Sequence, residues 1–452
     1  MRIEFEVPED ILHHLLDSVP IPQMARVRYE MVTPPPIADI AAAVKEGVRA
    51  AGAADSIKSG QRVAVGVGSR GIGRLPEIVA ALVSELRALG AEPFIVPAMG
   101  SHGGATAGGQ SEVLEHLGVT EERVGAPIVS SMDTVEVGRT DEGTSVRVDK
   151  NAMGADSIVF VARVKPHTAF RGRYESGLAK MIAIGLGKQS GAALTHARGF
   201  GHMAEMVPKM ATVALAKAPI RFGLGVIENA HDQPYKLVGV PAERILADEP
   251  ALLEEARRAM PRIPFDEFDV LVIDEIGKNI SGDGADPNIT GRYPTPDASG
   301  GPRVNKQVVL DLTVATGGNA NGLGTADFTT VRAARKVVFG NTYPNALTST
   351  VPRPVALPMV LPSDRLAFAA ALLTCNAVGH EPRLLRIKNT LSLGEFAVSV
   401  ALLDEVRANP ALRIVAGPAP VAFDAGGNLA DLAPADPLPA AAVAGSRSTG
   451  SQ

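Results

Sequence analysis

RVAVGVGSRGIGRLPEIVAALVSELRALGAEPFIVP, residues 62–97, decides the fold of this chain. It opens with an apolar strand (Arg62–Val67), passes through a glycine-rich turn into a helix (Leu75–Leu89), and ends in a second strand (Pro93–Pro97). A strand, a helix and a strand in this order form a βαβ unit, whose two strands are parallel. The sequence therefore predicts an α/β fold with a parallel, Rossmann-like sheet and helices on its faces.

The flanking sequence extends this unit on both sides. Residues 37–51 space their apolar side chains as an amphipathic helix, and a further apolar strand, Ser157–Val164, runs directly into the loop that holds His167. In open parallel sheets, ligands bind beyond the carboxyl ends of the strands. The loops that follow these strands, including the one with His102, are therefore where we expect a site.

A second unit is expected to begin near Phe265. Its predicted strands are Asp269–Asp274, Val308–Val314 and Lys336–Val338, and Leu366–Val378 is a predicted buried helix. We expect a larger N-terminal domain (1–264), a smaller C-terminal α/β domain (265–430) and a disordered tail (431–452) rich in Ala, Pro, Ser and Gly. The active site is expected in the cleft between the two domains.

The composition of the chain argues against several classes of protein. The 452 residues carry a net charge of −5, which argues against a broad nucleic-acid surface. The N-terminus, MRIEFEVPED, lacks the features of a signal peptide, and the chain has no unbroken apolar run of about 18 residues. The single cysteine, Cys375, excludes an internal disulfide and is expected as a buried thiol. A cytoplasmic enzyme without membrane contact is the expectation.

The turn Gly66–Gly71 matches G-x-G-x-x-G between a strand and a helix, where backbone N–H groups can approach a phosphate. A dinucleotide fold also places an acidic residue at the end of the next strand, but Val96–Met99 contains none. Ordinary NAD binding is therefore disfavoured. The loop can still hold an anion, with Arg70 as the cation.

A second glycine-lysine motif fails as a phosphate-binding loop. Gly187-Lys188-Gln189 has Ile182 where a Walker A loop needs glycine, and Gln189 where it needs Ser or Thr. We reject that interpretation.

Two histidines occupy the expected loops. His102 stands between glycines directly after a buried strand, so its ring is accessible to a substrate at a pKa near neutrality. Pro166 restrains the backbone before His167, which suits a positioned acid–base group. The alternatives are a surface histidine in a flexible turn for His102 and a structural histidine for His167.

Lys180 and His196 form a less usual pair. Lys180 lies within the apolar run SGLAKMIAIG, and burying an unpaired ammonium is costly, so such a lysine tends to be paired, modified or functional. His196 has no HxxxH or CxxC companion, so a closed zinc site is disfavoured. The alternatives are a Lys180 side chain that reaches solvent and a His196 that caps a helix.

The loop SGDGADPN contains Asp283, Asp286 and Asn288, whose oxygens could bind a cation. Their spacing lacks the pattern of a calcium loop. A polar turn packed against the other domain is the favoured interpretation.

Taken in order, Ser69-Arg70, Gly100-Ser101-His102, Pro166-His167, the Lys180 segment and His196 resemble the nickel-dependent lactate racemase family. The resemblance covers most of residues 1–230 and, more loosely, the loop near 282–292. It implies two domains around a nickel-pincer nucleotide, a pyridinium mononucleotide with thioamide and thiocarboxylate sulfur donors, covalently attached at Lys180. It further implies His196 as the nickel ligand, His102 and His167 as paired acid–base groups, and Arg70 and Ser69 as cofactor-binding residues.

The chain departs from that family in the second domain. The Gln and Lys that hold substrate in lactate racemases are replaced by Ile289-Thr290-Gly291-Arg292, so Arg292 or Lys278 is our tentative substrate cation. The acidic residue expected just before Arg70 is also absent. We therefore expect an isomerase, a racemase or epimerase of a 2-hydroxy acid or sugar acid, that depends on cofactor-biosynthesis enzymes and is a possible homo-oligomer. The alternatives are an NAD(P)-dependent oxidoreductase and a non-catalytic binding protein that retains the fold.

Overall fold

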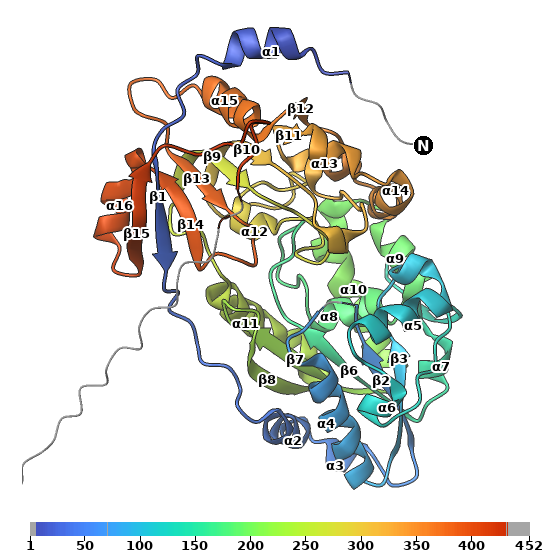
Figure 1. Ribbon diagram of the computed structural model, residues 1–452. Coiled ribbons are helices and arrows are strands. Elements are labelled where there is room, and N and C mark those ends of the chain that lie inside the picture. The colour runs from blue at the N-terminus through green and yellow to red at the C-terminus, as the bar shows by residue number, and fades with distance from the viewer. Residues whose placement is uncertain (1–5, 70, 431, 433–452) are drawn as a thin grey trace, which may run out of the picture.

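Two main β-sheets, each packed against helices, form this protein (Figure 1). The computed structural model describes residues 6–69, 71–430 and 432. It has the predicted α/β class, with parallel strands in both sheets. The predicted tail, residues 431–452, lies outside the described residues except for Leu432.

The smaller sheet contains the βαβ unit that the sequence predicted. Its strand order is β3-β2-β6-β7-β8, in which the first four strands are parallel and β8 runs antiparallel to β7. The strands are β2 (Arg62–Val67), β3 (Glu92–Pro97), β6 (Ser157–Arg163), β7 (Ile220–Glu228) and β8 (Pro234–Pro241).

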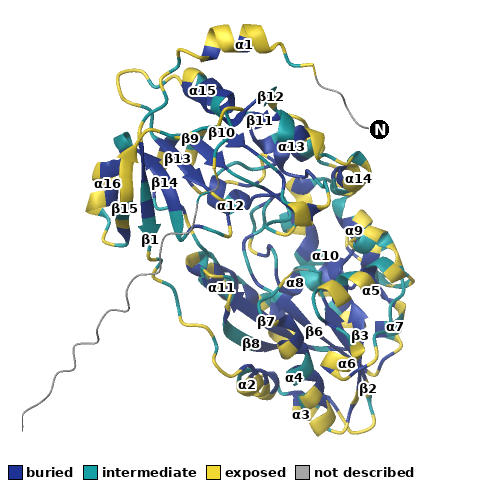
Figure 2. Ribbon diagram, in the orientation of Figure 1, coloured by how far each residue is buried: buried dark blue, intermediate teal, exposed yellow. Residues whose placement is uncertain are grey.

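Helices bury both faces of this sheet. Val65 and Val161 point to one face and pack with α2 and α4, whereas Phe160 on the other face packs with α8, α9, α10 and α11. Figure 2 shows these strands as a buried layer between helices that are exposed on their outer sides. The helices are α2 (Ile40–Ala50), α3 (Ala53–Ser56), α4 (Leu75–Ala88), α5 (Ala107–His116), α6 (Glu121–Val124), α7 (Lys150–Met153), α8 (Leu178–Lys180), α9 (Lys188–His196), α10 (Met203–Lys217) and α11 (Ile245–Ala259). A two-stranded ribbon, β4 (Thr134–Arg139) and β5 (Ser145–Asp149), packs beside them.

The larger sheet has the order β12-β11-β10-β9-β13-β14-β1-β15. The strands from β12 to β13 are parallel, and β14, β1 and β15 extend the sheet in antiparallel pairs. The strands are β1 (Met24–Tyr29), β9 (Glu267–Ile273), β10 (Arg303–Val309), β11 (Phe328–Thr330), β12 (Met359–Leu361), β13 (Leu384–Ile387), β14 (Glu395–Ser399) and β15 (Leu412–Ala419). The helices of this part are α1 (Glu9–Leu16), α12 (Pro287–Thr290), α13 (Val331–Arg335), α14 (Phe339–Ser349), α15 (Asp364–Thr374) and α16 (Leu403–Ala408).

One strand of the larger sheet comes from the start of the chain. β1 lies between β14 and β15, although its residues fall inside the predicted first domain (1–264). The predicted boundaries themselves, 1–264 and 265–430, stay predictions. The sheet built mainly from the C-terminal part is nevertheless the one with more strands, with or without β1.

Local predictions were wrong at two places in the second unit. Lys336–Val338 is not a strand but the short break between α13 and α14, where Val338 donates its N–H to the Gly318 carbonyl. Strand β10 ends at Val309, so residues 310–314 of the predicted strand Val308–Val314 lie outside it. In contrast, β2 spans the predicted residues and Cys375 is buried as expected.

Among the described residues, no helix combines the length and apolar character that a membrane crossing requires.

Candidate functional site

Three of the predicted site residues follow three adjacent strands. Ser69 comes after β2, His102 after β3 and His167 after β6, and these strands are neighbours in parallel register. The carboxyl ends of parallel strands share one edge of the sheet, so the three loops begin at the same edge. The topology therefore confirms the predicted position of the histidine loops.

The His102 loop is pressed against the turn that follows Lys180. Gly100 has φ +61°, a left-handed conformation that glycine adopts without strain, and a Cβ there would meet Ile184 and Ala192. His102 itself is exposed, and its Nδ1 is hydrogen-bonded to the Ser69 hydroxyl. Since a hydroxyl can donate or accept, this bond is compatible with either neutral tautomer of the ring.

The His167 loop is held by a buried carboxylate. The His167 backbone N–H donates to Glu175 Oε2 at 2.7 Å, and Glu175 is fully buried. On the ring, Nδ1 accepts the N–H of Ala169 at 3.0 Å, and the ring packs on Phe170 at 4.4 Å between centroids. Because Nδ1 accepts, the neutral ring carries its proton on Nε2. His167 is thus arranged as a proton donor at Nε2 in its neutral form.

Lys180 and His196 come together from two consecutive helical segments. Lys180 ends α8, a π-helical turn (Met181–Gly185) follows, and His196 is the last residue of α9. Burial lowers the pKa of His196, and the nearby positive charge of Lys180 lowers it further, against the opposing hydrogen bond to the Ala192 carbonyl. The ring is therefore neutral at neutral pH.

The hydrogen bond to Ala192 also fixes the tautomer of His196. Nδ1 lies 2.7 Å from the Ala192 carbonyl oxygen, which can only accept, so the neutral ring donates from Nδ1. Its lone pair is consequently on Nε2. This is the arrangement of metal-binding histidines, whose other ring nitrogen donates to a carbonyl or carboxylate.

Phe200 connects the two parts of this cluster. Its ring centroid is 5.5 Å from that of His196 and 6.1 Å from that of His167. His196 and His167 are thus neighbours around one aromatic ring, on the sheet face covered by α8, α9 and α10, and Lys180 is close enough to His196 to lower its pKa. His102 joins them indirectly, because its loop packs on Ile184, four residues after Lys180.

The second unit contacts the His167 loop through a polar turn. Lys165 Nζ lies 2.8 Å from Asp286 Oδ2, and Arg171 donates to Asn288 Oδ1 at 2.5 Å and to the Tyr293 hydroxyl at 2.7 Å. Burial raises the pKa of Asp286, but the charge of Lys165 and the hydrogen bonds from Lys165 and Asn288 together outweigh burial and hold that pKa below its usual range. These contacts confirm the prediction of a polar turn packed against the other unit.

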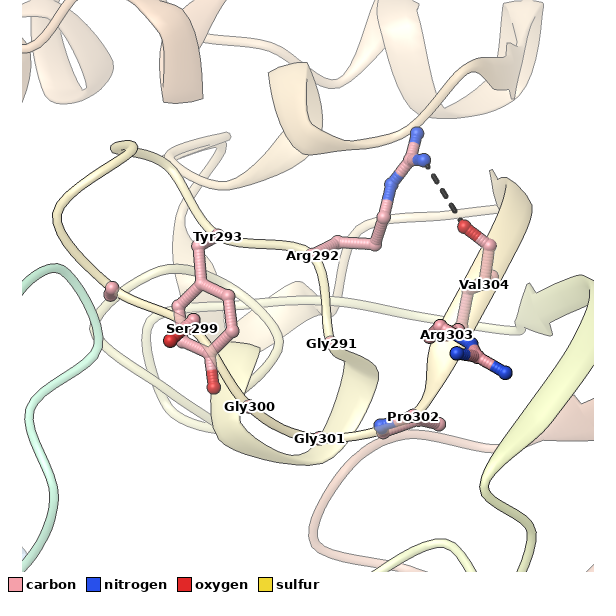
Figure 3. Close-up of a pocket in the computed structure, with 10 residues that line it drawn as sticks. Gly291, Arg292, Tyr293, Ser299, Gly300, Gly301, Pro302, Arg303 and Val304 are labelled. Atoms are coloured by element: carbon pink, nitrogen blue, oxygen red, sulfur yellow. Dashed lines mark hydrogen bonds between the residues drawn. The ribbon is translucent and has the colours of Figure 1, made fainter.

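The tentative substrate cations are engaged elsewhere. Arg292 is paired with Asp327 at 2.5 Å and also donates to backbone carbonyls, including that of Val304 (Figure 3). Lys278 Nζ donates to the Gly282 carbonyl at 2.6 Å. A substrate role for Arg292 or Lys278 stays a prediction that these contacts do not favour. Arg70 lies outside the described residues.

Sequence reasoning missed the residues that hold the loops in place. Glu175 and Arg171 fix the His167 loop, and Phe200 links two predicted site histidines. The segment FRGRYESG, which contains both Arg171 and Glu175, is the only signal for them, because its charges directly follow a predicted site loop.

A metal site built from protein groups alone is not present in the described ranges. No group of three or more His, Cys, Asp or Glu side chains there could hold a metal ion. The described residues bring one neutral histidine, His196, near one lysine, Lys180.

The part of the chain that holds this site is similar to a known protein family. Residues 16–206 match the family model of the lactate racemase N-terminal domain. The matched range contains all five of Ser69, His102, His167, Lys180 and His196, whereas Arg292 and Lys278 lie beyond it.

A solved structure resembles the chain over most of its length. It is the lactate racemase apoprotein from Thermoanaerobacterium thermosaccharolyticum, with 12% identity, 86% of this chain and 96% of that chain covered, and a TM-score of 0.49. No curated protein matches the chain.

Proposed function

We propose that this protein is a racemase or epimerase of a 2-hydroxy acid that works with a nickel-pincer nucleotide tethered to Lys180. The proposal rests above all on His196, a neutral ring with its lone pair on Nε2, beside Lys180 and one aromatic ring away from His167. The lactate racemase N-terminal domain around these residues supports the same reaction class.

The residues fit this cofactor better than a bare metal ion. Nickel in a square-planar site accepts soft sulfur and imidazole donors, and a cofactor that brings its own sulfur donors needs a single histidine from the protein. His196 is that histidine, and the amine of Lys180, close enough to lower its pKa, is the tether. When bound, the cofactor supplies an acceptor for the hydride from C2 of the substrate.

The protein's own part of the reaction is the movement of a proton. Oxidising a 2-hydroxy acid at C2 requires that a base take the hydroxyl proton, and reduction on the opposite face requires that an acid return it. His102 and His167 are the proposed pair. Either ring would act as the base in its neutral form and as the acid once it is protonated. His102, beside the Ser69 hydroxyl, starts as the base.

The second unit favours a substrate more polar than lactate. The turn that contacts the His167 loop presents Asn288 and Tyr293, both hydrogen-bonded to Arg171. Hydroxyl-bearing acids match such amide and phenol groups. We therefore favour a sugar acid, and dependence on cofactor-biosynthesis enzymes belongs to the same proposal.

The test combines mass, metal and stereochemistry. The chain is produced together with the cofactor-building enzymes, and intact mass, nickel content and interconversion of C2 stereoisomers in a panel of hydroxy and sugar acids are measured. We expect added mass and nickel in the native chain and in Lys217→Ala, an exposed control, and neither in Lys180→Ala. An unmodified, nickel-free native chain that interconverts no acid would exclude the proposal.

A further inference from the structure

A fully buried lysine lies beneath the His102 loop. Lys188, part of the rejected phosphate-loop motif, begins α9 and has no exposed surface. Its φ is +54°, a left-handed conformation that costs about 1–2 kcal/mol in a residue with a side chain. A glycine would remove this strain, so the lysine side chain itself must matter here.

The ammonium of Lys188 is surrounded by acceptors. Nζ donates to the Pro97 carbonyl at 2.5 Å and to Gln110 Oε1 at 3.0 Å, and it lies 3.1 Å from Asp149 Oδ2. Asp149 and Gln110 are also fully buried. Pro97 is the last residue of β3, so Lys188 is hydrogen-bonded to the end of the strand that leads into the His102 loop.

Gln110 carries this contact into the loop. Its Nε2 donates to the Gly100 carbonyl at 2.8 Å and to the His102 carbonyl at 3.3 Å. The orientation of the amide is unique, because Lys188 can only donate to it and the two carbonyls can only accept from it. One continuous chain of polar contacts thus runs from Lys188 through Gln110 to His102.

Stability alone does not account for this network. A buried ion pair such as Lys188–Asp149 is often no more stabilising than apolar residues of the same volume, because desolvation of the charges offsets their attraction. What the network does provide is a fixed backbone between Gly100 and His102. It also joins that backbone to α9, the helix that ends at His196.

We propose that Lys188 and Gln110 are positioning residues that set the His102 loop relative to the helix of His196. This inference deepens the proposed function, on which the acid–base role of His102 rests. The backbone around His102 sets the direction of its ring. The carbonyls of Gly100 and His102 accept hydrogen bonds from the Gln110 amide, and Lys188 holds that amide in place.

The sharpest test is Gln110→Glu, with Gln189→Glu as the matched control. A carboxylate at position 110 still accepts from Lys188 but can no longer donate to the two carbonyls, so it breaks the link without emptying the site. Gln189 is exposed and directly follows Lys188. Lys188→Met is the second variant, which removes the link from its other end.

The first measurement uses the full chain without cofactor. Histidine ring signals are recorded by NMR, and His102→Gln identifies the His102 signal. We expect Gln110→Glu to shift or broaden that signal while the others stay in place, and Gln189→Glu to change none.

The second measurement uses the loaded protein. We expect Gln110→Glu to lower kcat for stereoisomer interconversion about 10- to 100-fold, as loss of a supporting contact typically does, with little change in KM. If Gln110→Glu leaves the His102 signal unchanged, the positioning role is wrong. If the native chain interconverts no acid, the proposed function fails, while the NMR result still decides whether Gln110 positions His102.

Discussion

The buried carboxyl group of Glu249 constrains the backbone just before Lys180. It lies in α11 without exposed surface, and its Oε2 accepts the N–H of Ala179 at 2.7 Å, directly before Lys180. Gly177 permits this approach, because a Cβ there would overlap the carboxyl group. Burial raises the pKa of Glu249 to about 7, against the opposing hydrogen bonds from the backbone.

The raised pKa predicts a pH-dependent stability. Between the ordinary value of 4.5 and about 7 the folded chain binds a proton that the unfolded chain releases, so stability falls as pH rises through this window. The loss attributable to Glu249 is roughly 3 kcal/mol at its maximum. We expect Glu249→Gln to flatten the dependence of the unfolding free energy on pH, measured by urea titration from pH 5 to pH 7.5.

Glu254→Gln is the control for this measurement, since Glu254 lies on the exposed side of the same helix. It should leave the slope unchanged. An unaltered slope in Glu249→Gln would show that the carboxyl group is ionised in the folded chain throughout this range.

At the residue scale, position along the strands was predictable and burial of charge was not. Ser69, His102 and His167 were found because each follows an apolar strand, and parallel strands bring such loops together. Glu249 sits in LADEPALLEE, which looks like an ordinary charged helix, and Lys188 follows a glycine in a failed motif. Packing against residues far along the chain buries the side chains of Glu249 and Lys188. The spacing of the residues next to them in the sequence does not indicate this burial.

At the scale of the element, helix α5 offers an internal comparison. Gly108 and Gly109 are consecutive residues of its first turn, just after the His102 loop. A Cβ at Gly109 would overlap the Gly103 carbonyl oxygen, whereas a Cβ at Gly108 meets no atom within 4 Å. Close packing therefore requires glycine at position 109 but not at position 108.

We expect Gly109→Ala to destabilise the protein by about 1–3 kcal/mol, because the loop must shift to admit the methyl group. Gly108→Ala should be neutral or stabilise by up to about 1 kcal/mol, since alanine favours the helix. Thermal unfolding of both variants checks this. Equal effects would mean that the loop does not pack as closely as the structure shows.

Elements were predicted well where periodicity was long and poorly where it was short. The helix and strands of residues 62–97 have nearly their expected bounds. A 14-residue amphipathic helix between two apolar runs is compatible with only one assignment of secondary structure. The prediction of a strand at Lys336–Val338 was wrong, although Val337 and Val338 are β-branched, as strand residues often are. The residues around it instead continue as α13 and α14, and three residues were too few to show this.

At the scale of the whole molecule, the contact between the two parts centres on Asp286. We expect Asp286→Asn to destabilise the protein by about 1–3 kcal/mol, because Lys165 loses a charged partner in a poorly hydrated place. Guanidinium unfolding measures the change. Asp266→Asn, at an exposed residue of the same unit, should change little.

The lowered pKa of Asp286 also makes the stability that this contact provides depend on pH. Because its folded pKa lies below the ordinary 3.8, the carboxylate stabilises the protein above that value, and the contribution is lost as pH falls through the folded pKa. The difference in stability between the native chain and Asp286→Asn should therefore shrink in strong acid. A constant difference would contradict a charged Asp286.

The overall class was predictable, and the membership of each sheet was not. Alternating strands and helices identify α/β architecture, and apolar strands identify parallel sheets. Nothing in MARVRY, residues 24–29, indicates that its partners are β14 and β15, about 370 to 395 residues further along. Pairing over such a distance depends on which edges the rest of the chain leaves open.

The place of β1 has a consequence for the order in which the protein can fold during synthesis. Its six residues leave the ribosome long before the two strands that flank it, which lie within residues 395–419. Domains generally fold as they emerge, and the smaller sheet is complete once residue 241 has been made. Strand β1 must therefore wait without its neighbours until residues 395–419 have been translated.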